Sequence, residues 1–205
     1  MKNKSFQNKE ELFQAALDEF TQKSYKDASL NNILKKAGMS KGAFYYHFKN
    51  KEDLYFSILE EVHDAEHEFI EEHIKEIGEN ITEKNFFEIL KIYGEAGLEF
   101  SIRHPKYYHL VQRLLKENEK IIRNFIDKKL NEHMEGLFEK LILEAIQRGE
   151  LRNDFSLEFI KKLIKNLFQN FSFIFLQDID EFDFDKLIKT YDDYIDFIEN
   201  GLGKK

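Results

Sequence analysis

The sequence predicts an all-α protein with a small N-terminal three-helix domain and a larger helical C-terminal domain. Proline and glycine are scarce: one proline and nine glycines in 205 residues are few for a β-rich or loop-rich chain. Charged residues make up 34% of the chain, and the abundant Glu, Lys and Leu favour helices. Along most of the chain, apolar residues recur at helical spacing. The hydrophobic fraction of 42% is enough for a substantial core.

The composition excludes several classes of site. The chain contains no cysteine, so disulfides, thiolate zinc sites and cysteine nucleophiles are ruled out. Residues 1–13 lack the apolar run of a signal peptide. The most apolar stretch, residues 168–176, is too short to span a membrane and includes polar residues. We therefore expect a soluble cytoplasmic protein.

Charge is distributed unevenly along the chain. Residues 1–55 contain ten Lys and seven Asp or Glu, a net charge of +3. The whole chain carries −8, so residues 56–205 carry −11. Such asymmetry indicates two modules with different partners, which we expect at 1–55 and 56–205.

A first helix is expected over residues 9–22, where apolar residues recur at 3.6-residue spacing. Its apolar face consists of Leu12, Phe13, Ala16, Leu17 and Phe20. The acidic residues Glu10, Glu11, Asp18 and Glu19 are expected to lie outside this face.

Two short helices follow. The second begins after Ser29, a good N-cap, and stops at Gly38, because glycine readily enters the left-handed region. Ser40 then caps a third helix over residues 41–48. Two short helices joined by a three-residue turn have the spacing of a helix-turn-helix motif.

The helix-turn-helix segment is basic. Residues 28–51 contain five lysines and no acid, which is typical of a surface that meets phosphates. Phe44 and Phe48 should pack inward, leaving Lys41 for guanine, Ala43 for a thymine methyl and Gly42 for close approach to base edges. The candidate DNA-binding residues are Ser29, Asn31, Lys41, Gly42, Ala43, Tyr45, Tyr46, His47, Lys49 and Lys51.

At these residues the chain resembles the N-terminal helix-turn-helix of the TetR/AcrR family of bacterial regulators. The resemblance covers residues 9–56 and rests on Ser29, Ile33, Ala37-Gly38-Met39-Ser40-Lys41-Gly42, Phe44-Tyr45, His47-Phe48, Lys51 and Leu54. It implies an all-helical homodimer whose first three helices bind an operator and whose C-terminal domain binds a small effector. It also implies phosphate contacts at Ser29, Tyr46, His47 and Lys51, and base contacts near Asn31, Lys41, Gly42, Ala43 and Tyr45.

The remaining chain is expected to be helical as well. A fourth helix over residues 51–77 joins the two modules without a flexible linker, so the joint should be stiff. Pro105 suits the first turn of a helix, and Ser156 and Asp183 suit positions at helix starts. The later helices are expected over 82–103, 105–117, 119–148, 156–177 and 183–200.

The last two helices carry apolar surfaces too broad for a single solvated face. By similarity to the family, they pair with their copies across a two-fold axis as a four-helix bundle. A second possibility is that both apolar stripes are only the core of one chain. The candidate dimerisation residues are Phe159, Leu163, Leu167, Phe171, Tyr191, Tyr194, Ile195 and Ile198.

An effector pocket is predicted from aromatic residues of the second module. Gly94 and Gly97 weaken an otherwise helical run, so they make room either for a ligand or for close helix packing. An aromatic stripe at helical spacing is also what an ordinary core contains. The candidate effector-binding residues are Tyr93, Phe100, Tyr107, Tyr108 and Phe168.

We do not expect an enzyme, a metal or a cofactor. Residues 63–67 fit the H-x-x-E-H pattern of inverted zinc peptidases, with His63, Glu66 and His67 as the candidate residues of a metal-dependent hydrolase. No third ligand or substrate cleft accompanies them. A DNA-binding protein of low specificity and a helical interaction module, both without an effector, are also compatible with the sequence. The sequence favours a homodimeric transcriptional regulator, most simply a repressor released from a palindromic operator by a small apolar or amphipathic effector.

Overall fold

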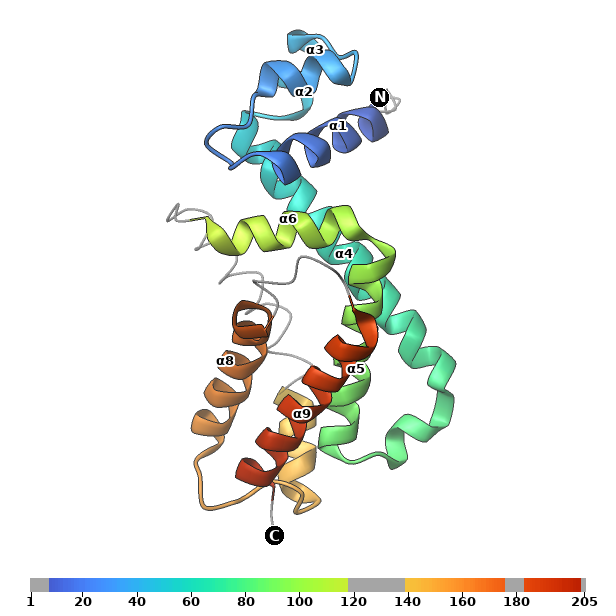
Figure 1. Ribbon diagram of the computed structural model, residues 1–205, viewed down its shortest axis with the longest axis vertical. Helices are drawn as coiled ribbons and strands as arrows, with labels where there is room; N and C mark the ends of the chain where they lie inside the picture. Colours follow the sequence, from blue (N-terminus) through green and yellow to red (C-terminus); the bar gives the residue numbers. More distant parts are fainter. Residues whose placement is uncertain (1–7, 118–138, 176–182, 204–205) are drawn as a thin grey trace. The chain divides into compact units, whose positions relative to one another are not determined.

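The computed structural model describes residues 8–117, 139–175 and 183–203, and within these ranges all regular structure is helical (Figure 1). The β pairing within these ranges is an isolated bridge between Leu151 and Gly203. The helices are α1 (Lys9–Gln22), α2 (Leu30–Lys36), α3 (Lys41–His47), α4 (Lys51–Ile77), the 3₁₀ helix η1 (Gly78–Glu83), α5 (Phe86–Arg103), α6 (Pro105–Lys116), α8 (Leu157–Phe175) and α9 (Phe184–Leu202). Residues 139–147 are also helical. The predicted all-α class is confirmed.

The chain divides by its internal contacts into two units. The first unit comprises the described parts of Met1–His67 and His104–Ile122, and the second those of Glu68–Arg103 and Arg123–Lys205. The first unit therefore includes α6 as well as the three N-terminal helices and the first part of α4. The expected division into 1–55 and 56–205, which rests on the charge asymmetry and the helix-turn-helix, stays a prediction.

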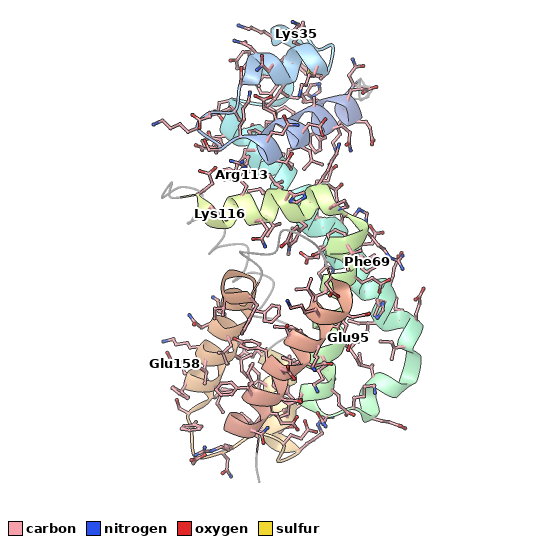
Figure 2. The ribbon with its side chains drawn as sticks, in the orientation of Figure 1. Lys35, Phe69, Glu95, Arg113, Lys116 and Glu158 are labelled. Carbon is pink, nitrogen blue, oxygen red and sulfur yellow. The ribbon has the colours of Figure 1, made fainter. Side chains whose placement is uncertain are left out.

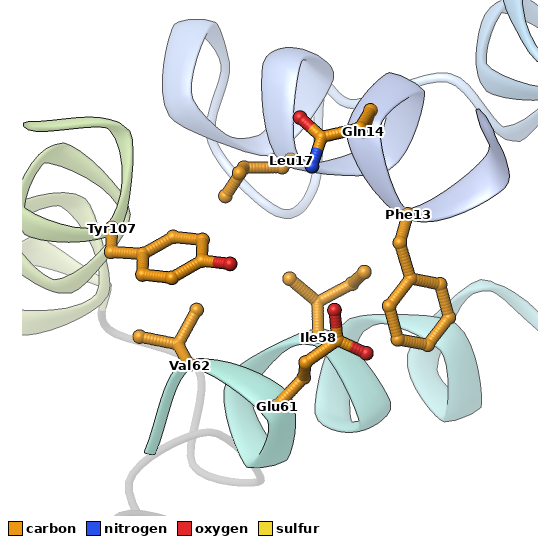
Figure 3. Close-up of a pocket in the computed structure, with 7 residues that line it drawn as sticks. All are labelled: Phe13, Gln14, Leu17, Ile58, Glu61, Val62 and Tyr107. Carbon is orange, nitrogen blue, oxygen red and sulfur yellow. The ribbon is translucent and has the colours of Figure 1, made fainter. Parts of the chain in front are cut away.

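The first unit is built on α1, which packs against α2 and α6. Its apolar face is buried as predicted, and the most enclosed large side chains here include Leu12, Phe20, Phe44 and Tyr55. Basic residues, among them Lys35, end α2 and are exposed (Figure 2). Between α1, α4 and α6 lies a small pocket (Figure 3), lined by Phe13, Gln14, Leu17, Ile58, Glu61, Val62 and Tyr107.

The helix-turn-helix forms as its sequence predicts. The Ser29 hydroxyl accepts a hydrogen bond from the Asn32 N–H at 3.4 Å, and the Ser40 hydroxyl accepts one from the Ala43 N–H at 3.2 Å. Each serine thus satisfies one of the N–H groups that a helix start leaves unpaired. Gly38 has a φ of +62°, a backbone conformation that side chains disfavour, so the turn needs glycine there.

The start of α5 differs from the prediction. The helix begins at Phe86 rather than near residue 82, because η1 occupies Gly78–Glu83. Asn85 and Glu88 form a reciprocal capping pair, in which each side chain accepts a hydrogen bond from the other's backbone N–H at 2.9 and 2.8 Å. This pair satisfies two N–H groups of the first turn and marks the start of α5.

The second unit has its core where α5 packs against α9. The Tyr191 hydroxyl donates a hydrogen bond of 3.0 Å to the Leu90 carbonyl, which links the two helices. A Cβ on Gly94 would collide with the Tyr191 ring. Of the two roles that the sequence left open for this glycine, close helix packing is therefore the one observed. Within the described ranges, no helix has both the length and the apolar character needed to cross a membrane.

Candidate nucleic-acid interface

Helix α3 has one buried and one exposed face. Phe44 is fully buried and Phe48 is 8% exposed, and their rings stack with centroids 5.4 Å apart. Tyr45 and Tyr46 are 57% and 79% exposed, which is unusual for large aromatic side chains. The other exposed residues of this helix are Lys41, Gly42, Ala43 and His47. The predicted division of α3 into two faces is thus confirmed.

The exposed face of α3 has the chemistry of a DNA-reading surface. It offers an ammonium group, two phenol hydroxyls and an imidazole, with no carboxylate on the helix. Gly42 is open on its outer side, since a Cβ there would meet no atom within 4 Å. Nothing within the described protein therefore requires glycine at this position for packing. Asn31 and Lys49, two further candidate DNA contacts, are also exposed.

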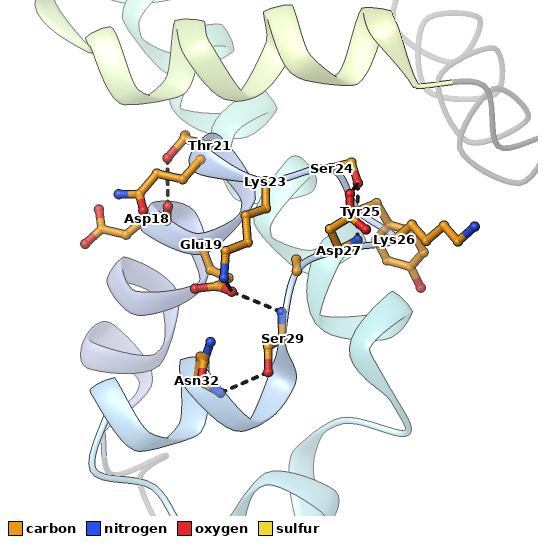
Figure 4. A network of polar contacts seen from close by, with 12 residues as sticks. Asp18, Glu19, Thr21, Lys23, Ser24, Tyr25, Lys26, Asp27, Ser29 and Asn32 are labelled. Carbon is orange, nitrogen blue, oxygen red and sulfur yellow. Dashed lines mark hydrogen bonds and ion pairs between the residues drawn. The ribbon is translucent and has the colours of Figure 1, made fainter.

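The Ser29 backbone is held by Glu19 (Figure 4). One Glu19 carboxylate oxygen accepts hydrogen bonds from the Ser29 N–H at 3.1 Å and from Lys23 Nζ at 2.6 Å. The bond from Lys23 is the main cause that lowers the pKa of the Glu19 carboxyl, and the Ser29 N–H adds to it. A buried carboxylate thus connects the last turn of α1 to the N-cap of α2.

The expectation that Glu19 lies outside the buried face of α1 is wrong, because only 2% of the residue is exposed. Helical spacing places Glu19 close to Ala15 and Ala16, which are both buried. Two small side chains leave room for a longer one to turn inward. That was a weak sequence signal, and it could not have identified the Ser29 N–H as the partner.

Lys51 is bonded within the protein. Its Nζ donates hydrogen bonds to the carbonyls of Tyr25, Lys26 and Ala28 at 2.6, 3.2 and 2.8 Å. It also lies 4.6 Å from the centroid of the Tyr25 ring. Burial lowers the pKa of this ammonium, while the charges of Asp27 and Glu117 act in the opposite direction. These three acceptors use all three N–H bonds of the Lys51 ammonium group. The phosphate contact expected at Lys51 stays a prediction.

The candidate effector-binding residues fall in different units. Tyr107 and Tyr108 lie on α6 in the first unit, whereas Tyr93 and Phe100 lie on α5 in the second. Tyr108 and Phe100 are buried, and Phe100 packs against Phe69 with ring centroids 5.6 Å apart. The side chain of Phe168 lies outside the described part of the structure. The role of these five residues stays a prediction.

The candidate dimerisation residues divide into buried and exposed groups. Phe171, Tyr191, Tyr194, Ile195 and Ile198 are buried within the chain itself. Phe159 is 47% exposed, and Leu163 and Leu167 are half-buried. The sequence pattern did not single out Phe197 on α9, which is 74% exposed. Exposed apolar side chains on both α8 and α9 are therefore available for a second chain.

The H-x-x-E-H pattern of residues 63–67 is accompanied by no cluster of metal-binding side chains among the described residues. All five lie in the described part of α4, yet the described residues include no group of three or more His, Asp or Glu side chains able to hold a metal ion. Burial raises the pKa of the Glu66 carboxyl to about 7. Such a shift weakens the carboxylate as a metal ligand near neutral pH.

Comparison with known proteins agrees with this surface. Residues 12–58 match the model of the bacterial regulatory proteins of the tetR family. The "Fatty acid metabolism regulator protein" of Bacillus subtilis (strain 168) is 26% identical over 157 residues, which are 75% of this chain and 76% of that protein. The "Probable acrEF/envCD operon repressor" of Escherichia coli (strain K12) is 26% identical over 172 residues, covering 82% and 75% of the two chains.

The fold agrees over nearly the whole chain. The crystal structure of the transcriptional regulator FadR from Bacillus subtilis, in complex with stearoyl-CoA, superposes with a TM-score of 0.73. The match covers 94% of this chain and 98% of that one, at 19% identity. Three observations lead to one conclusion. The third helix of the helix-turn-helix is exposed and free of acidic residues, the family model matches the same segment, and the fold is shared. Residues 12–58 carry the helix-turn-helix of the tetR family of bacterial regulatory proteins, and the chain has the all-α fold of TetR-family regulators.

Proposed function

We propose that the protein is a homodimeric repressor that binds a palindromic operator through α3 and releases it when a small apolar or amphipathic effector binds. The observation that carries the proposal is the exposed face of α3, which presents Lys41, Tyr45 and Tyr46 over a buried Phe44. Burial of Phe44 fixes the orientation of α3, so the exposed face of this helix is basic and aromatic. Such a face suits the major groove, where a short helix can reach base edges and phosphates.

A two-fold dimer follows from the geometry of DNA recognition. One seven-residue helix such as α3 contacts too few bases for high specificity. Two copies in successive major grooves, about 34–36 Å apart, double the number of contacts and require a palindrome. The chain has no arginine before Arg103, so it lacks the bidentate Arg–guanine contact in this domain. Operator spacing and DNA shape should then contribute much of the specificity.

A long-chain acyl-CoA is the effector class that we propose to test first. The Bacillus subtilis FadR that shares this fold was solved with stearoyl-CoA. The sequence of the second unit is rich in phenylalanine, and apolar and aromatic side chains are the usual lining of small-molecule pockets. Micromolar stearoyl-CoA should release the protein from its operator, whereas free CoA should not. Equal release by both would point to the nucleotide rather than the acyl chain.

Lys41 tests whether α3 reads bases. A duplex that the full-length protein selects from a randomised library serves as the operator. The change Lys41→Ala should weaken binding to this duplex by about 1–3 kcal/mol and relax its preference at one base pair, measured by competition at constant salt. Lys75→Ala, which removes an exposed lysine from the far end of α4, is the matched control and should leave binding unchanged.

The same competition separates a regulator from a protein that coats DNA. A regulator should prefer the selected palindrome over random duplex by a factor of about a thousand or more. A coating protein should bind both alike with a steep dependence on salt. Similar affinities for selected and random DNA would rule out the proposed function.

A further inference from the structure

Helix α6 is attached to the C-terminal end of α1 by an arginine. Arg113 Nε donates a hydrogen bond of 3.1 Å to the Thr21 carbonyl, and its Nη2 donates one of 3.1 Å to the Gln22 carbonyl. These carbonyls belong to the last turn of α1, where a helix has no intrahelical donors left. A guanidinium there satisfies them and complements the negative end of the helix dipole. The bonds therefore fix α6 against the end of α1.

Four residues further on, a carboxylate reaches the loop between α1 and α2. A Glu117 oxygen accepts a hydrogen bond of 2.7 Å from the Tyr25 N–H. Lys106, near the start of α6, pairs with Asp18 at 2.6 Å. Polar contacts thus connect both ends of α6 to α1 and the loop that follows it. We call Arg113 and Glu117 the α6 clamp, because both bind main-chain groups of residues 21–25.

The same loop is also held by α4. Lys51 donates to the carbonyls of Tyr25, Lys26 and Ala28, and the Tyr25 ring packs on Tyr55 with centroids 5.0 Å apart. The clamped segment is therefore bonded to both α6 and α4. It has little freedom to move unless one of these helices moves as well.

The loop leads directly into the DNA-reading helices. It ends at Ser29, whose N–H is bonded to Glu19 and whose hydroxyl caps α2. Helix α3 follows α2 after a short turn at Gly38. The main-chain position of residues 21–29 therefore determines where α2 and α3 begin relative to α1, α4 and α6.

We propose that Arg113 and Glu117 are positioning residues for DNA binding, acting through the α1–α2 loop rather than by touching DNA. The proposal rests on the proposed function. It names the contacts that hold the segment leading into α2 and α3.

Arg113→Met tests the arginine, and Lys116→Met is its matched control. Both remove one positive charge from the last turn of α6, where Lys116 is exposed whereas Arg113 is bonded to the end of α1 (Figure 2). With the duplex selected by the wild-type protein, Arg113→Met should lose about tenfold in affinity, the loss expected for charge-assisted hydrogen bonds. Lys116→Met should stay within about twofold.

The salt dependence distinguishes a positioning residue from a phosphate contact. Each lost phosphate contact reduces the slope of log K against log salt by about 0.9. A residue that acts through the loop should lower affinity without changing that slope. A slope reduced by about one in Arg113→Met would show a direct phosphate contact and overturn the proposal.

Glu117 gives a second test that does not depend on Arg113→Met folding normally. Glu117→Gln keeps an acceptor oxygen for the Tyr25 N–H, whereas Glu117→Ala removes it. Hydrogen exchange of the segment 23–28 should be near wild type in Glu117→Gln and at least about tenfold faster in Glu117→Ala. DNA affinity should follow the same order.

The outcomes separate this proposal from the proposed function. If the wild-type protein selects no duplex, the proposed function fails, and the exchange data still show whether the clamp exists. If it selects a duplex but Arg113→Met binds like Lys116→Met, the function stands and the positioning role is overturned. Equal exchange and equal DNA affinity in Glu117→Gln and Glu117→Ala would overturn it as well.

Discussion

Glycine at two positions shows how one residue type can serve opposite purposes. Gly94 is required by the interior of the protein, because any side chain there would overlap the Tyr191 ring. Gly42 faces open space on the exposed side of α3. Glycine inside a helix is costly relative to alanine, so its presence at an open position calls for an external reason. Close approach of α3 to DNA is the reason we propose.

The change Gly42→Ala should therefore separate stability from function. It should raise the free energy of unfolding by about 0.5–1 kcal/mol, measured in urea, since alanine has the higher helix propensity. It should also weaken binding to the selected duplex, because the added methyl group holds α3 away from the bases. Gly201→Ala is the control, since Gly201 lies in α9 and is equally open. That variant should gain stability without losing affinity, and unchanged DNA binding by Gly42→Ala would contradict the role we assign to this glycine.

The boundaries of α2 and α3 could be predicted from the sequence because their causes are local. Ser29, Gly38 and Ser40 each act within four residues of their own position, and the structure confirms all three. The two faces of α3 also follow from spacing alone. The partners of Glu19, Lys51 and Arg113 are main-chain groups of other segments, between 10 and 92 residues away. Chain folding decides such pairings, and no local pattern encodes them.

The junction between α1 and α2 depends on the charge of Glu19. Hydrogen bonds from Lys23 and Ser29 lower the pKa of its carboxyl from the usual 4.5. A carboxyl with a depressed pKa in the folded state stabilises the fold when it is ionised in both states, above about pH 4.5. This contribution is lost as the pH falls through the pKa that Glu19 has in the folded protein, because protonation neutralises the carboxylate that accepts the hydrogen bonds.

Glu19→Gln should accordingly lower stability in a pH-dependent way. At pH 7 we expect a loss of about 1 kcal/mol, because a neutral amide oxygen is a weaker acceptor for both donors. The difference from wild type should shrink as the pH is lowered below about 4.5, measured by urea unfolding at several pH values. Glu11→Gln, at an exposed position on the same helix, should change stability by only a few tenths of a kcal/mol. If the free energy of unfolding of Glu19→Gln differed from that of the wild type by the same amount down to about pH 3, the charge-dependent role would be refuted.

At the level of the assembly, the sequence left open whether the last two helices form a core or an interface. The structure shows that the core accounts for one side of α9, because Tyr191, Ile195 and Ile198 are buried within the chain. Phe159 on α8 and Phe197 on α9 remain exposed. Large exposed aromatic side chains are typical of surfaces that bind another protein, and a second copy of the chain is the partner that the proposed palindromic operator would require.

Phe197→Asp tests this interface. A charge placed in an apolar contact between subunits must be desolvated, so the variant should be monomeric at concentrations where the wild-type protein is a dimer, as measured by sedimentation equilibrium. The fold of the chain should tolerate the change to within about 0.5 kcal/mol, because Phe197 is exposed in the isolated chain. Asn200→Asp adds the same charge to an exposed position of α9 and is the control.

Loss of the dimer should also appear in DNA binding. A monomer contacts one half-site only, so Phe197→Asp should bind the selected palindrome about as weakly as a single half-site. The wild-type protein should bind the palindrome far more tightly than a half-site, and Asn200→Asp should behave like the wild type. If Phe197→Asp and Phe159→Asp both remain dimeric with full affinity, the subunits meet elsewhere. The exposed aromatic residues of α8 and α9 would then need another partner, while the DNA-reading face of α3 would be unaffected.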